Sequence, residues 1–368
     1  MRRLLLALML PLMVASPAHA ACIEAKSAPD ALAIYGQLVM IGFTGSAASH
    51  NGVKEALAQV EQGYAGGLVF FGRNITGVKQ IRSLTGLFSK HATGVKPFLA
   101  VDEEGGKVER LTPRNGFAKQ PTARSIASRG PKSARQIYSR MAGDVAAAGF
   151  NFNLGPVVDL DLRRNNPIIG KLDRSYSRDP EVVAEYAQVF IEAHRQKKIA
   201  TALKHFPGHG SSRRDSHVSV VDVTGDWQED ELIPYRELIA DGLVDAVMMA
   251  HLINREIWSP ENLPATFSRN AVKILREDLK FDGVIVSDDL QMAAIAKDHP
   301  LAQAIVQSLA AGNDMVLIGN VKVQQPEAAK FAVRTITDAV ARGELDHSRL
   351  EQSFCRVMKL KKQSAGAG

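Results

Sequence analysis

The segment ATALKH, at residues 200–205, is a short apolar run that ends in two basic side chains. Seven other segments repeat the pattern of a short apolar or β-branched run. Near-continuous hydrophobicity is typical of strands that are buried on both faces of a parallel sheet. The pattern therefore predicts eight buried strands, at residues 38–43, 67–71, 98–102, 152–158, 200–205, 246–251, 283–288 and 315–318.

Segments with apolar residues at helical spacing separate these runs. They span residues 134–148, 182–196, 229–241 and 302–311, and Gly149, Gly242 and Gly312 supply stop signals. Eight strand–helix units without a repeat signature or a long linker predict an α/β fold, a single-domain (β/α)8 TIM-type barrel. The main alternative is a doubly wound open sheet, in which eight parallel strands lie side by side without closing.

The first twenty residues have the features of a signal peptide. Arg2 and Arg3 precede an apolar run over residues 4–14, and the AHA sequence at residues 18–20 provides small residues for cleavage after Ala20. The apolar run is shorter than the roughly twenty residues that span a bilayer, so stable membrane insertion is not expected. We therefore predict a signal peptide at 1–20, a single folded domain at 21–368, and a periplasmic or secreted protein.

Composition limits the partners of the mature chain. The formal net charge of +6 falls to +4 when Arg2 and Arg3 are removed. This balance, without a basic cluster interleaved with aromatic residues, argues against nucleic-acid binding. Only Cys22 and Cys355 are present, so an oxidising compartment could join them, although two free thiols are equally compatible with the sequence. Lipid attachment at Cys22 and the oligomeric state remain open.

Polar side chains occur at the carboxyl ends of four predicted strands. Asp102, His205, His251 and Asp288 each end an apolar run. In a parallel barrel these ends meet at one rim, where barrel enzymes assemble their active sites. A purely structural role would require a separate partner for each buried polar group. The four positions thus predict one site at the mouth of a barrel.

The fifth run continues into a segment that is dense in proton-handling groups. KHFPGHG at residues 204–210 is followed by DSH at residues 215–217. Gly208 and Gly210 disfavour regular structure and favour an exposed loop. A solvated polar loop without function is the alternative interpretation, and the wider sequence context decides between the two.

Five segments together resemble glycoside hydrolase family 3, and most closely its bacterial single-domain β-N-acetylglucosaminidases. The resemblance extends from about residue 36 to residue 319, and KHFPGHG followed by DSH is its most specific part. The segments are VDEEGGKVERL (101–111), LDRSYSRDP (172–180), KHFPGHG (204–210), DSH (215–217) and FDGVIVSDDLQM (281–292).

The resemblance implies the catalytic residues. Asp288 matches the family nucleophile, with the adjacent Asp289 as a competitor whose alternative role is structural. His217 matches an unusual histidine acid/base, and Asp215 matches the carboxylate that orients the imidazole ring. The implied reaction is a retaining hydrolysis of terminal β-linked N-acetylglucosamine through a covalent glycosyl-enzyme. No metal or cofactor is implied.

The resemblance also implies how a glycan that contains N-acetylglucosamine is bound. Five residues match positions around the non-reducing sugar: Asp102, Arg110, Arg174, Lys204 and His205. His209, His251 and Asn254 are weaker candidates, with His209 expected to shape its loop and His251 to support the nucleophile strand. The natural aglycone, whether a peptidoglycan fragment, a chitooligosaccharide or another group, is left open.

Other functions remain compatible with these motifs. A histidine acid/base repels an incoming phosphate less than a carboxylate would, so a β-N-acetylglucosaminide phosphorylase is one alternative. A β-glucosidase is another, although such relatives commonly take their acid from a second domain. A barrel metallohydrolase would use the histidines as ligands. A non-catalytic envelope glycan-binding protein would keep the fold without needing the Asp215–His217 pair.

Overall fold

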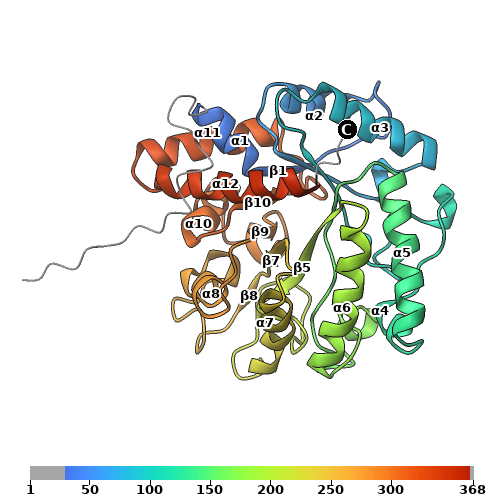
Figure 1. The fold of residues 1–368 in the computed structure, drawn as a ribbon. Coiled ribbons are helices and arrows are strands. Elements are labelled where there is room, and N and C mark those ends of the chain that lie inside the picture. The colour runs from blue at the N-terminus through green and yellow to red at the C-terminus, as the bar shows by residue number, and fades with distance from the viewer. Residues whose placement is uncertain (1–29, 365–368) are drawn as a thin grey trace, which may run out of the picture.

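Eight parallel strands close into a barrel, as the apolar runs predict. The structure, a computed structural model, describes residues 30–364 (Figure 1). The order around the barrel is β1-β10-β9-β7-β5-β4-β3-β2, so strands that follow one another in the chain are neighbours, and β1 pairs with β10 to close the ring. The strands are β1 (Val39–Gly42), β2 (Gly67–Phe70), β3 (Phe98–Val101), β4 (Phe152–Asn153), β5 (Ala200–Phe206), β7 (Ala246–Met249), β9 (Val284–Asp289) and β10 (Met315–Ile318).

Helices surround the barrel and cover its outer face. Figure 1 shows α5 and α6 side by side, with α1 next to the last helix, α12. Contacts between Tyr35 Oη and His347 Nδ1 (2.8 Å), and between Lys361 Nζ and Gln37 Oε1 (2.6 Å), join the two ends of the described chain. The helices are α1 (Ala31–Gln37), α2 (Asn51–Glu61), α3 (Val78–His91), α4 (Ala123–Ala127), α5 (Pro131–Ala147), α6 (Pro180–Arg195), α7 (Ile233–Ala240), α8 (Arg269–Lys273), α9 (Ala293–Ala296), α10 (Leu301–Ala311), α11 (Ala328–Ala341) and α12 (His347–Ser364).

Most predicted elements agree with the observed ones to within a few residues, and two differ more. The fourth strand ends at Asn153 rather than at Val158, because Pro156 has no N–H to donate to the ladder. The helix predicted over 229–241 is divided into a 3-10 turn (Glu229–Leu232) and α7, and Pro234 lies in the first turn of α7, where its missing N–H costs nothing. Both differences shorten regular structure next to a proline.

A small parallel pair, β6 (Val221–Asp222) and β8 (Leu252–Ile253), lies outside the barrel and was not predicted. It joins the loop after β5 to the loop after β7. This pairing ties together the two loops that follow the residues His205 and His251. The rim of the barrel is therefore partly built from hydrogen-bonded loops.

Several predictions concern the chain ends. The predicted signal peptide lies outside the described residues, and so does Cys22, whose predicted bond to Cys355 of α12 stays a prediction. Within residues 30–364, no helix combines the length and the apolar character that crossing a bilayer requires.

Candidate active site at the carboxyl rim of the barrel

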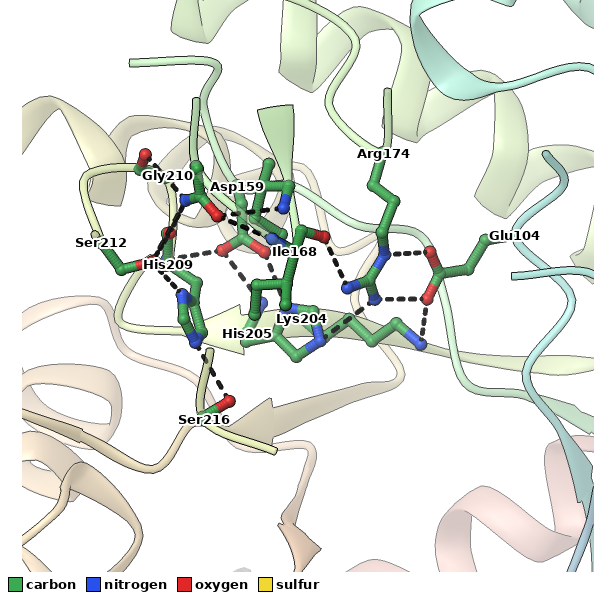
Figure 2. A network of polar contacts seen from close by, with 12 residues as sticks. Glu104, Asp159, Ile168, Arg174, Lys204, His205, His209, Gly210, Ser212 and Ser216 are labelled. Carbon is green, nitrogen blue, oxygen red and sulfur yellow. Dashed lines mark hydrogen bonds and ion pairs between the residues drawn. The ribbon is translucent and has the colours of Figure 1, made fainter. Parts of the chain in front are cut away.

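A buried ion-pair network lies at the ends of β3 and β5. Lys204 Nζ contacts Asp102 Oδ1 and Glu104 Oε1, both at 2.7 Å. Arg174 donates two hydrogen bonds of 2.8 Å to the carboxylate of Glu104 in a bidentate pair (Figure 2). The side chains of Lys204, Glu104 and Arg174 are 3, 7 and 8 % exposed. Two cations thus share one buried carboxylate, while Asp102 remains 19 % exposed.

The network favours the charged forms of Glu104, Arg174 and Lys204. Burial alone would raise the pKa of Glu104, but Arg174 and Lys204 lower it well below its ordinary value. Burial likewise opposes the charge of Lys204, and Asp102 and Glu104 reverse that effect and raise its pKa. Arg110 Nη2 lies 3.8 Å from Asp102 Oδ2 and extends the network toward the mouth. The predicted residues Asp102, Arg110, Arg174 and Lys204 therefore lie together.

His205 lies beside this network at Arg174, and it also contacts a carboxylate that the sequence analysis missed. Its Nδ1 contacts Asp159 Oδ2 at 2.6 Å, and its Nε2 lies 3.4 Å from Arg174 Nη2. The buried Asp159 also accepts the backbone N–H of His209 through Oδ1 at 2.7 Å. Burial raises the pKa of Asp159, and His205 and His209 lower it to below its ordinary value. Asp159 follows the predicted fourth run directly, so extending the rule of polar strand ends by one residue would have found it.

Asp288 and Asp289 end β9 in different environments. The Asp289 Oδ1 atom accepts the N–H groups of Gly319 (2.8 Å) and Gln291 (3.0 Å), which turns this carboxylate toward β10. Burial raises the pKa of Asp289 to about 6. Burial also raises the pKa of Asp288, but His251, His205 and His217 together lower it below its ordinary value. Asp288 is thus the member of the pair that is held ionised among the imidazoles.

His251 supports the end of β9, as predicted. Its Nε2 lies 3.0 Å from the backbone oxygen of Asp289, and its Nδ1 lies 2.8 Å from Thr266 Oγ1. Since a carbonyl oxygen only accepts hydrogen bonds, His251 Nε2 carries a proton. Burial lowers the pKa of the His251 ring. The ring is therefore held in a fixed orientation behind the two aspartates.

The Asp215–His217 pair lies on the loop after β5. Asp215 Oδ1 contacts both the backbone N–H and the ring Nδ1 of His217 at 2.8 Å. Because Asp215 occupies Nδ1, the Nε2 atom is the nitrogen that is left to face a substrate. The side chains of His217 and Asp215 are 56 and 30 % exposed. This pair is the accessible part of the site.

A backbone contact connects the loop of this pair to the loop after β9. The carbonyl oxygen of Ser216 accepts the N–H of Ala294 at 3.3 Å. Ser216 precedes His217, and Ala294 lies six residues after Asp288. The contact agrees with the electrostatic effect of His217 on Asp288. The acid/base and nucleophile candidates are thus brought to the same side of the rim, as the sequence motifs predict.

No group of three or more His, Cys, Asp or Glu side chains between residues 30 and 364 is arranged to hold a metal ion. A cavity of about 520 Å³ lies at the opposite, amino-terminal end of the barrel, beside Ala200, Val284 and Leu360. None of the rim residues lines that cavity. The chemistry of the rim is therefore that of carboxylates, imidazoles and fixed cations.

A closed barrel with carboxylates and imidazoles gathered at its carboxyl rim is typical of the class of barrel enzymes. Residues 34–360 match the Glycosyl hydrolase family 3 N terminal domain. The chain belongs to glycoside hydrolase family 3 and has the (β/α)8 fold, which confirms both the resemblance and the predicted architecture.

Individual relatives support this assignment. A beta-hexosaminidase of Tolumonas auensis is 40% identical over 267 residues, which cover 69% of this chain and 75% of the relative. A beta-hexosaminidase of Pseudomonas aeruginosa is 40% identical over 263 residues, with the same coverage of both chains. These matches extend over most of the barrel.

Solved structures are similar over nearly the whole chain. The family 3 beta-N-acetylglucosaminidase of Paenibacillus sp. FPU-7 has a TM-score of 0.84 at 33% identity, and the match covers 93% of this chain and 64% of that protein. The Beta-N-acetylhexosaminidase of Beutenbergia cavernae has a TM-score of 0.80 at 28% identity, and the match covers 91% and 99% of the two chains. This chain thus spans about two thirds of the Paenibacillus protein and nearly all of the Beutenbergia protein.

Proposed function

We propose that this chain is a retaining exo-β-N-acetylglucosaminidase that removes terminal β-linked N-acetylglucosamine. The observation that supports it most is the hydrogen bond between Ser216 and Ala294, which places the Asp215–His217 loop beside the end of β9. The names of the relatives above, beta-hexosaminidase and beta-N-acetylglucosaminidase, support the choice of sugar.

In the proposed first step, the ionised Asp288 attacks the anomeric carbon. The protonated Nε2 of His217 gives its proton to the glycosidic oxygen as the bond between carbon and oxygen breaks. Asp215 holds the ring by its Nδ1 and stabilises the imidazolium before transfer. A covalent glycosyl-enzyme on Asp288 and a neutral His217 result.

In the proposed second step, the neutral His217 takes a proton from water. The water oxygen attacks the anomeric carbon, and the bond to Asp288 breaks to release the carboxylate and a sugar of retained configuration. The exposure of His217 serves this step, because both the departing aglycone and the incoming water must reach Nε2.

The buried network is the proposed subsite for the terminal sugar. Asp102 is its most exposed carboxylate and can accept hydrogen bonds from sugar hydroxyls, while Lys204 and Arg110 hold it in place. Asp159 occupies Nδ1 of His205, so Nε2, which lies 3.4 Å from Arg174 Nη2, is the ring nitrogen left for a sugar hydroxyl. Arg174 donates two hydrogen bonds to Glu104, so it acts on the bound sugar mainly through its fixed positive charge. Its remaining N–H groups can still donate hydrogen bonds.

Labelling with a 5-fluoro N-acetylglucosaminyl fluoride, which keeps the acetamido group at C2, tests the nucleophile. The label is expected on Asp288, and a label on Asp289 or elsewhere would contradict the assignment. Aryl β-glycosides with and without the N-acetyl group, assayed with and without phosphate, then separate the activities. Loss of the N-acetyl group should abolish most turnover, whereas release of a sugar 1-phosphate would indicate a phosphorylase.

The proposed location is the periplasm or the exterior, where peptidoglycan fragments or chitooligosaccharides are possible substrates. The basis is the basic and apolar pattern of residues 1–20. Amino-terminal sequencing of protein from the periplasmic fraction should begin at Ala21. An intact amino terminus in the cytosolic fraction would contradict export.

A further inference from the structure

His209 is a buried imidazole that the proposed reaction does not use. It lies in the loop directly after β5, and its Nδ1 is 2.5 Å from Ser212 Oγ while its Nε2 is 3.2 Å from Ser216 Oγ (Figure 2). Its backbone N–H is held by Asp159. Burial lowers the pKa of His209 to about 4, so the ring is neutral near pH 7 and has one donor and one acceptor nitrogen.

The contacts of Ser212 decide which nitrogen carries the proton. The Ser212 hydroxyl donates to the His209 carbonyl at 2.9 Å and accepts an N–H from Asn166 Nδ2 at 3.1 Å. With its only proton already donated, Ser212 can only accept from the ring, so His209 Nδ1 is the protonated nitrogen. His209 Nε2 therefore carries a lone pair, and Ser216 donates its hydroxyl proton to it.

Ser216 is thus held from two sides. Its hydroxyl donates to the imidazole of His209 in the KHFPGHG segment, and its carbonyl accepts from Ala294 beyond β9. The residue is 3 % exposed, whereas His217, the next residue, is largely exposed. Ser216 therefore fixes the loop to the protein interior immediately before His217, the proposed acid/base.

We propose that the hydrogen bond from Ser216 Oγ to His209 Nε2 is a latch that positions His217 over the substrate, with His209 and Ser216 as positioning residues for the acid/base. This inference depends on the proposed function, since it assigns a task to His217. Asp159 links the latch to the sugar subsite, because its two oxygens bind His205 and His209.

The test compares Ser216→Ala with Ser219→Ala on two substrates. Ser219 lies on the same loop, and within residues 30–364 its hydroxyl makes no hydrogen bond. The substrates are chitobiose, whose leaving group needs a proton, and 2,4-dinitrophenyl N-acetyl-β-glucosaminide, whose leaving group needs none. For Ser216→Ala we expect kcat/KM to fall roughly tenfold on chitobiose and less than about twofold on the dinitrophenyl substrate.

Further measurements distinguish the latch from general loosening of the loop. If His209 and Ser216 act as a pair, a double variant of Ser216→Ala with His209→Gln should be no worse than the worse single variant. Equal losses on both substrates, or Ser216→Ala behaving like Ser219→Ala, would overturn the latch. Labelling of Asp288 by the 5-fluoro donor in Ser216→Ala is the separate check: if Asp288 is still labelled, failure of the latch leaves the proposed function intact.

Discussion

The buried network around Lys204 and the exposed Asp215–His217 pair each place a basic side chain at hydrogen-bonding distance from a carboxylate, but their surroundings differ. Lys204 is 3 % exposed, and its partners hold its charge within the barrel. His217 is 56 % exposed and has one carboxylate partner. The difference is consistent with the two roles in the proposed mechanism, in which the buried network binds one sugar and the accessible imidazole exchanges protons with the leaving group and with water.

The energetic consequences of the two regions also differ. A buried ion pair contributes little net stability, but removal of one partner leaves an uncompensated charge and costs about 3–5 kcal/mol. An exposed pair contributes at most about 1 kcal/mol. Variants of the network should therefore affect folding and binding, while variants of the Asp215–His217 pair should affect turnover alone.

The largest effect is expected for Asp288→Asn, at the point where the two regions meet. An amide cannot form the glycosyl-enzyme, so kcat should fall by roughly 10⁴-fold or more. Steady-state kinetics on an aryl N-acetyl-β-glucosaminide measure the loss, with Asp289→Asn as the neighbouring control. A greater loss for Asp289→Asn would transfer the nucleophile role to that residue.

His217→Ala tests the exposed region. Removal of the general acid/base should lower kcat by roughly 10²- to 10⁴-fold, most on substrates with a poor leaving group. The free energy of unfolding should change by less than about 0.5 kcal/mol, because the side chain is mainly solvated. Urea denaturation beside the kinetics checks both parts, and unchanged turnover would favour a non-catalytic glycan-binding protein.

Glu104→Gln compared with Asp215→Asn tests the contrast directly. Removing the charge of Glu104 leaves Arg174 and Lys204 undercompensated, so the unfolding free energy should fall by about 3 kcal/mol and KM should rise. Asp215→Asn should change stability by less than about 0.5 kcal/mol and lower kcat instead. Urea denaturation of both variants under the same conditions measures the two changes in the free energy of unfolding. Equal destabilisation would contradict the distinction between the two regions.

The smallest effect concerns Glu231, a buried carboxyl beneath the KHFPGHG loop. Its Oε2 accepts the Gly210 N–H at 2.7 Å, and burial raises its pKa to about 8. The pKa of Glu231 is higher in the folded chain than in the unfolded chain, so the folded chain binds this proton more tightly. The resulting stabilisation is fully present below about pH 4.5 and is lost as the pH rises toward 8. Glu231→Gln should therefore flatten the decline of stability between about pH 5 and 8, which thermal melts at several pH values can measure. An unchanged slope would show that another group titrates there.

The fold was predictable because it depends on local patterns. Strands buried on both faces give uninterrupted apolar runs, and each of the eight predicted runs overlaps a barrel strand. Polar residues at run ends, such as Asp102 and Asp288, identified the rim, because a charged side chain is tolerated where a strand leaves the core. The bounds were less predictable near Pro156 and Pro234, where single residues alter hydrogen bonding.

The site was only partly predictable, because its partners are distant in the chain. Glu104 lies within a segment that the motif analysis singled out, yet nothing in the local sequence indicates that it pairs with Arg174, seventy residues away. Glu231 carries no motif that distinguishes it from a surface carboxylate, and the only sequence signal for Asp159 is that it directly follows the fourth predicted run. Their burial and their partners depend on how the barrel closes.

By itself the sequence determined the eight-strand barrel, the family, and the rim on which Asp288 and His217 lie, because hydrophobic periodicity and short motifs are properties of neighbouring residues. Only the tertiary structure decided that Asp159 joins His205 to His209, and that Ser216 lies between His209 and Ala294. The physical reason is that a hydrogen bond depends on separation in space. Closure of the barrel sets that separation for residues that lie far apart along the chain.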